Sequence, residues 1–110
     1  MTNCKPYLIV AGVFIILDIV SGLLKAFYSG EFSSEKMRKG IYHKATYVLI
    51  IALAITCELS EAYIELGFSI PLVKPTTAYI IFCEFMSIIE NIGAINPSLK
   101  EYTDRFMHNE

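Results

Sequence analysis

The chain has 110 residues, of which 55% are hydrophobic and 18% are charged. This length suits one domain, and a soluble domain of this size would need polar side chains over most of its exposed surface. The charges are instead gathered in a few places, and long stretches carry almost none. The sequence therefore predicts an all-α integral membrane protein with a single membrane domain, residues 1–110, and no nucleic-acid partner.

The first apolar segment, residues 6–28, is long enough to cross a bilayer as a helix. About 20 apolar residues span the roughly 30 Å of hydrocarbon. Pro6 suits a first helical turn, where its missing N–H leaves nothing unpaired, and Gly30 is a typical stop signal. Only Lys5 precedes the run, and no small-residue cleavage site follows it. We therefore expect a retained transmembrane helix and not a signal peptide.

The next segment, residues 31–44, is polar and basic. Ser33 or Ser34 would cap a short helix, with Glu35 in the first turn, where an acidic side chain is favourable. Gly40 argues against a long regular helix. We expect a short interfacial helix or a structured loop that keeps its basic side chains in water, namely Lys36, Arg38, Lys39 and Lys44.

A second span is predicted over residues 45–66. Its continuous apolar part has only thirteen residues, so a full crossing requires Glu58 and Glu61 to lie near the far interface. A buried or re-entrant segment is the alternative. Residues 67–75 contain two prolines and are interpreted as the turn that follows.

A third span is predicted over residues 75–95. Asn96 and Pro97 interrupt it and provide an N-cap and a first-turn proline for a last helix. That short helix, residues 98–107, is amphipathic and is expected to lie against the membrane. Three transmembrane helices and two short surface helices complete the predicted fold, with oligomeric assembly expected.

Positive charge in short loops predicts the orientation of the spans. The first connection carries Lys25 together with the four basic residues of the loop. The second connection carries only Lys74, among three glutamates. We therefore expect the first connection and the C-terminus in the cytoplasm, and the N-terminus outside.

Three ionisable side chains lie inside the predicted spans, where each costs roughly 2.5–3.5 kcal/mol on insertion scales and so suggests a function. They are Asp18, Glu84 and Glu90. In the first span, Asp18 shares a face with Gly22 and Lys25, and Ser21 lies alongside. Small residues let a second helix approach closely, and the polar side chains can bond across the contact. The face is predicted to meet another helix or another copy of the chain.

The third span carries a second polar face. Its members share one side of the helix, with Glu90 at the edge, and are Thr77, Glu84, Ser87 and Asn91. One interpretation is static, with these groups hydrogen-bonded inside a closed bundle. The other is a face that meets water during function. Both interpretations stay open, because a bundle that rearranges would satisfy both.

No sequence motif points to an enzyme. A nucleophile elbow, a phosphate loop and a zinc-helix motif are all missing from the sequence, and the three cysteines form no C-x-x-C pair. We expect no catalytic residue, no metal site and no cofactor.

Two stretches have a familiar order and spacing. The first combines Asp18-x-x-x-Gly22-x-x-x-Ala26 with Phe32-Ser33-Ser34, Arg38-Lys39-Gly40 and Lys44, and the second is Glu84-Phe85-x-Ser87-Ile88-x-Glu90-Asn91-x-Gly93. Over residues 10–100 the chain resembles the phage lysis and toxin-secretion holins. These include small holins of Gram-positive phages and the clostridial toxin-secretion holin. The family's usual turn before a longer basic tail is only partly present in residues 93–100.

The resemblance implies a pore-forming protein that associates with itself in the bacterial cytoplasmic membrane. The holes would release an endolysin or a large toxin, without requiring that this cargo touch the protein. Membrane lipid and an antiholin are further partners that the resemblance implies. The alternative is an antiholin or another non-lytic regulatory or scaffolding subunit, which needs the same spans and faces. A transporter is disfavoured, because no inverted repeat or pair of broken helices is present.

Overall fold

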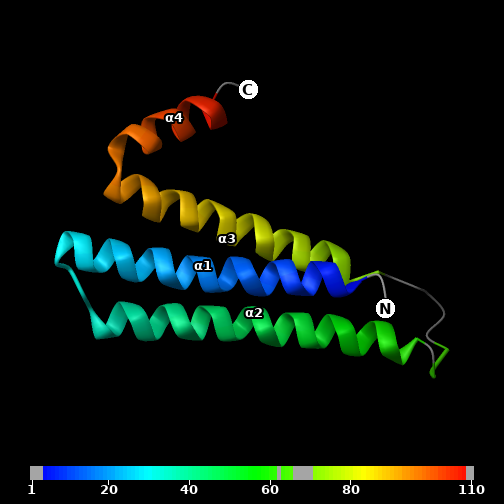
Figure 1. Cartoon of the computed structure of the whole chain (residues 1–110). Helices are drawn as coiled ribbons and strands as arrows, with labels where there is room; N and C mark the ends of the chain where they lie inside the picture. The colour runs from blue at the N-terminus through cyan, green and yellow to red at the C-terminus, as the bar shows by residue number, and fades with distance from the viewer. Residues whose placement is uncertain (1–3, 62, 66–70, 109–110) are drawn as a thin grey trace.

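The computed structural model describes residues 4–61, 63–65 and 71–108, which form four α-helices and, within those ranges, no strand (Figure 1). The helices are α1 (Lys5–Ser29), α2 (Ser34–Ser60), α3 (Val73–Ile95) and α4 (Pro97–His108). Three of them, α1, α2 and α3, are long and apolar enough to cross a membrane. The predicted all-α fold with three spans is therefore confirmed.

Helix α1 begins and ends within one residue of the predicted bounds, residues 6–28. Pro6 lies in its first turn, and Gly30 caps its C-terminus with a φ of 72°, a left-handed conformation that glycine adopts without a steric penalty. Its 25 residues extend about 38 Å, more than the hydrocarbon thickness. The helix therefore has length to spare for a tilt or for an interfacial turn.

Helix α2 differs from the prediction at both ends. Residues 34–44 form its first turns, so the short helix expected in the first loop is not a separate element. Ser33 is the N-cap, and its side chain accepts a hydrogen bond from the Lys36 backbone N–H at 3.3 Å. Gly40 does not interrupt the helix, because one interior glycine costs only about 1 kcal/mol and the apolar residues that follow extend the helix.

At its other end α2 stops at Ser60, and Glu61 is the C-cap. The predicted second span continued to residue 66, which lies outside the described residues, as do residues 67–70 of the predicted turn. The 27 residues of α2 extend about 40 Å as one continuous helix. Continuity over that length favours a full crossing over a re-entrant segment.

Helix α3 begins at Val73, two residues before the predicted start, and ends at Ile95 as predicted. Asn96 takes an extended conformation with a φ of −125°, and α4 follows directly (Figure 1). The C-terminal helix is thus present. Its described apolar side chains Leu99 and Tyr102 are exposed, and its contact with the membrane surface stays a prediction.

Helices α1 and α3 make the most extensive contact in the bundle, and α2 contacts chiefly α3. Figure 1 shows the three long helices lying side by side. The connections make α1 and α3 parallel and α2 antiparallel to both. A small apolar cluster, Cys4, Ala54 and Val73, joins the three helices at one end. Most large apolar side chains are exposed, as expected for helices whose outer surface meets lipid.

Candidate functional site

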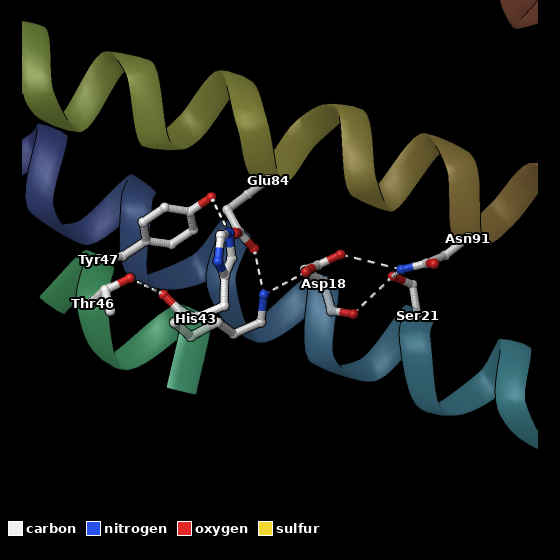
Figure 2. A network of polar contacts seen from close by, with 8 residues as sticks. Asp18, Ser21, His43, Thr46, Tyr47, Glu84 and Asn91 are labelled. Atoms are coloured by element: carbon white, nitrogen blue, oxygen red, sulfur yellow. Dashed lines mark hydrogen bonds and ion pairs between the residues drawn. The ribbon is translucent and has the colours of Figure 1, made fainter. Parts of the chain in front are cut away.

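A buried cluster of charged side chains joins the three long helices near their middle. The Lys44 ammonium of α2 lies 2.5 Å from Asp18 Oδ2 of α1 and 3.0 Å from Glu84 Oε2 of α3. In Figure 2 the carboxylates of Asp18 and Glu84 both point to the side-chain nitrogen of Lys44. The three residues are far apart in the sequence. One cation thus holds two anions, and each of the three groups comes from a different helix.

A second set of bonds ties Asp18 to the later part of α3. The Asn91 side-chain amide donates to Asp18 Oδ1 at 3.2 Å and to Ser21 Oγ at 3.0 Å (Figure 2). The Ser21 hydroxyl in turn donates to the Asp18 backbone carbonyl at 3.1 Å. Both carboxylate oxygens of Asp18 are therefore hydrogen-bonded, one by Lys44 and one by Asn91. We call Asp18, Ser21, Lys44, Glu84 and Asn91 the polar network.

Burial gives the polar network its energetic importance. Glu84 is 2% exposed and Asp18 is 9% exposed, while the Lys44 side chain is 14% exposed. An unpaired charge at this depth would cost several kcal/mol, and a buried pair that loses one partner leaves that cost uncompensated. Within the described ranges, every fully buried side-chain nitrogen and oxygen has a hydrogen-bond partner. The buried polar atoms of the network therefore all have hydrogen-bond partners within the protein.

His43 and Tyr47 flank Lys44 on α2. Their side chains are 3.0 Å apart between His43 Nε2 and Tyr47 Oη, and their rings meet edge to face (Figure 2). The Thr46 hydroxyl donates to the His43 carbonyl at 2.5 Å. These contacts lie within one turn of α2 and are exposed, so they shape the helix surface beside the polar network and do not add to its burial.

The structure brings together four of the predicted association residues, Asp18, Ser21, Glu84 and Asn91. Gly22 lies where α1 approaches α3, and a Cβ added there would be 3.7 Å from the Asn91 amide nitrogen. A methyl group at this distance would make an ordinary contact, so the position requires a small side chain, and the polar network forms beside it.

Ser87 lies beside Asp18 at the edge of the polar network, whereas the other predicted residues lie apart from it. Thr77 is fully buried, but its hydroxyl bonds to the Val73 carbonyl of its own helix, about 10 Å along α3 from Glu84. Ser87 and Lys25 line a cavity next to the network. Glu90 is exposed on α3, and no described side chain forms an ion pair with it.

The structure corrects the predicted position of Lys44. We expected it in water with Lys36, Arg38 and Lys39, but it lies inside α2 with its ammonium between two buried carboxylates. A signal was available, because two intramembrane acids need a cation and Lys44 is the basic residue directly before the second apolar run. The sequence alone does not show which way the side chain of a residue at the edge of an apolar segment turns.

Glu58 has a structural role that the sequence did not indicate. Its Oε2 accepts a hydrogen bond of 2.6 Å from the backbone N–H of Val73, the first residue of α3. The first N–H groups of a helix have no partner within the helix, so this carboxylate from the end of α2 caps α3. No group of three or more metal-binding side chains occurs among the residues described.

The comparisons with known proteins agree with this architecture. The sequence profile of the bacteriophage holin family matches residues 1–105, nearly the whole chain. No match was found among curated proteins or among solved structures. The holin family consists of membrane pore-formers and not of enzymes, in line with the lack of any enzyme motif in the sequence. The chain belongs to the bacteriophage holin family.

Proposed function

We propose that this chain is a holin that associates with itself in the bacterial cytoplasmic membrane and opens holes for an endolysin or a large toxin. The observation that carries the proposal is the polar network, which joins all three spans of one copy through the two ion pairs of Lys44. Family membership supports the same function. Such a protein must be stable in lipid before opening and must line a water-filled hole afterwards.

The polar network supplies a mechanism for the closed state. While Lys44 holds Asp18 and Glu84, these three buried charges are satisfied within one copy, and the outer surface is largely apolar apart from the exposed Glu90 of α3. Separating these groups in lipid would expose three charges to hydrocarbon, which is costly. A single copy therefore keeps its polar faces hidden and accumulates without harming the membrane.

Opening follows when water replaces the ion pairs. Helix α2 makes limited contact with the rest of the bundle, so it can move away from α1 and α3 once Lys44 is released. In a ring of copies the freed polar faces line the lumen, where hydration compensates the lost pairs. The exchange is favourable only when several copies enclose water together, so the hole opens abruptly at a threshold of accumulation.

The proposed orientation keeps the connection between α1 and α2 in the cytoplasm. Lys44 no longer counts toward this loop, because it is paired inside the bundle. Lys25, Lys36, Arg38 and Lys39 still lie at this end of the spans, against Lys5 and Lys74 at the opposite end, a ratio of four to two. The positive-inside rule therefore gives the same orientation as before, with the N-terminus outside.

Induced expression in a bacterium tests the proposal. We expect an abrupt loss of membrane potential, followed by release of a cytosolic marker enzyme, after a delay that shortens as expression rises. A matched culture expressing the Lys44→Met variant at equal membrane abundance shows whether timing depends on the polar network. Continued growth with full membrane potential, while the protein is abundant in the membrane, would refute pore formation. If co-expression then delayed lysis by a lytic holin, the protein would be an antiholin.

A further inference from the structure

A cavity of about 470 Å³ lies between the C-terminal half of α1 and the first turns of α2. Its volume is within the 300–1,000 Å³ typical of sites that bind small molecules. Three members of the polar network, Asp18, Lys44 and Asn91, form its inner end together with Ser87. At the other end its lining residues are exposed, so the cavity opens to the surface near the loop between α1 and α2.

The length of the cavity matches one leaflet of a bilayer. Along α1 its lining runs from Asp18 to Ser29, which are eleven positions apart and therefore about 16 Å apart along the helix axis. Half of the roughly 30 Å of hydrocarbon is about 15 Å. The cavity therefore reaches from the interface at the loop to about the middle of the membrane, the depth that one acyl chain occupies.

The walls are apolar over most of this length. Ile19 and Leu23 of α1 face Met37 and Ile41 of α2 across the cavity. Gly40 also lines it, and a Cβ added to Gly40 would meet no atom within 4 Å. The missing side chain leaves open space in the wall of α2. Such a surface excludes an ion but suits a hydrocarbon chain.

The mouth of the cavity is basic. Lys25 of α1 and Lys36 of α2 stand on opposite walls there, both exposed, and neither forms an ion pair with a described carboxylate. The hydroxyls of Ser29 and Ser33 lie at the same end, and Glu31 is the one acid there. Two unpaired ammonium groups above an apolar slot match an anionic headgroup above an acyl chain.

We propose that this cavity binds one anionic phospholipid of the leaflet that contacts the basic loop. The phosphate lies between Lys25 and Lys36, and an acyl chain runs along Ile19, Leu23 and Ile41 towards the polar network. A bound chain keeps water from the Asp18–Lys44 ion pair on the loop side. Lipid binding requires only the transmembrane fold, whereas its effect on hole opening rests on the proposed function.

Lipid retention by the full chain tests the proposal. The protein is reconstituted in nanodiscs of equal parts phosphatidylglycerol and phosphatidylcholine, and the lipid that stays bound is counted by native mass spectrometry. We expect phosphatidylglycerol to be retained in preference to phosphatidylcholine. Because a basic residue near an anionic lipid contributes about fivefold to affinity, Lys25→Gln with Lys36→Gln should lower phosphatidylglycerol binding at least tenfold.

A matched double variant separates the site from general attraction. Arg38→Gln with Lys39→Gln removes the same charge from the same end of the bundle, but neither residue lines the cavity. It should retain phosphatidylglycerol as the unmodified chain does. Equal loss in the two double variants would overturn the proposal, since it would show that the loop attracts anionic lipid without a specific site.

A third variant tests the acyl slot with every charge in place. Gly40→Leu fills the wall of α2 and should reduce phosphatidylglycerol retention severalfold, while far-ultraviolet circular dichroism shows unchanged helix content. Retention unaltered by Gly40→Leu would overturn the assignment of the cavity. A preparation that is always dimeric and retains no lipid would also overturn it, in favour of a second copy in the cavity. None of these readouts requires a hole to open, so they stand apart from the test of lysis.

Discussion

Lys44 and Glu84 are 40 residues apart in the chain, yet Lys44 Nζ lies 3.0 Å from Glu84 Oε2 inside the helical bundle. The same ammonium pairs with Asp18, so a single side chain of α2 connects it to both neighbouring helices. Since α2 otherwise packs sparsely, we infer that its position in the bundle depends strongly on Lys44.

The first prediction concerns the loss of this cation. Lys44→Met keeps an unbranched side chain of similar length but leaves the Asp18 and Glu84 carboxylates facing each other without a counter-charge. Removing one partner of a buried pair typically costs about 3–5 kcal/mol. We expect a lower thermal midpoint in detergent and earlier lysis at equal membrane abundance. Lys39→Met is the control, because Lys39 pairs only at the exposed surface with Glu35. Equal midpoints and equal lysis times in the two variants would contradict the role of Lys44.

The second prediction is that removing all three charges restores stability but not timing. The triple variant Asp18→Leu, Lys44→Met and Glu84→Leu replaces the ion pairs by apolar contacts, a change that is often neutral or stabilising in buried sites. Membrane insertion should become easier. The bundle should melt at or above the temperature of the unmodified chain, and lysis should be delayed or lost. Lysis on the normal schedule would show that the charges do not act in opening.

The single variants Asp18→Leu and Glu84→Leu are measured beside the triple variant. Each should alter oligomer size or triggering time more than it alters insertion. Unchanged timing and oligomer size in both would refute the association role of these carboxylates.

The third prediction concerns the close contact of α1 with α3. A Cβ at Gly22 would lie 3.7 Å from the Asn91 amide nitrogen, an ordinary contact, so Gly22→Ala should be tolerated. Gly22→Leu is too large for this space and should separate the helices and weaken the Asn91–Asp18 hydrogen bond. Thermal melting in detergent should show a loss of about 1–3 kcal/mol for leucine, typical of overpacking, and little for alanine. Equal losses of stability in Gly22→Ala and Gly22→Leu would contradict a close contact of α1 with α3 at Gly22.

The fourth prediction tests the cap supplied by Glu58. Glu58→Ala removes the acceptor for the Val73 N–H and should cost about 1 kcal/mol, as lost helix caps do. Amide hydrogen exchange at the start of α3 should quicken, while exchange near Asn91 stays unchanged. Glu65→Ala is the control, since Glu65 is an exposed acid in the same connection. Equal amide exchange at the start of α3 in both variants would contradict the capping role of Glu58.

The fifth prediction concerns orientation. A cysteine at Ser34 should react with a membrane-impermeant maleimide only after the cells are opened, whereas a cysteine at Glu65 should react in intact cells. The three native cysteines are replaced by serine in both variants. Labelling of Ser34→Cys in intact cells, before any hole forms, would reverse the assignment of the two faces.

The sequence predicted the helices well where local chemistry decides the structure. The stop at Gly30 and the break at Asn96 both follow from backbone preferences that act within a few residues. The sequence did not predict the start of α2, because local preferences there argue against a helix. Its first turns are polar and contain Gly40, which argued for a loop, but the Ser33 cap and the long apolar segment behind it make one helix.

The sequence by itself determined that the chain spans a membrane three times and that Asp18 and Glu84 lie within the spans. Hydrocarbon imposes these features, because apolar length and the cost of a charge depend on residue type and count. Only the tertiary structure decided that Lys44 leaves the water and holds both carboxylates. A lysine at the edge of an apolar segment can turn its side chain to water or to a buried anion, and the choice depends on which helix lies beside it.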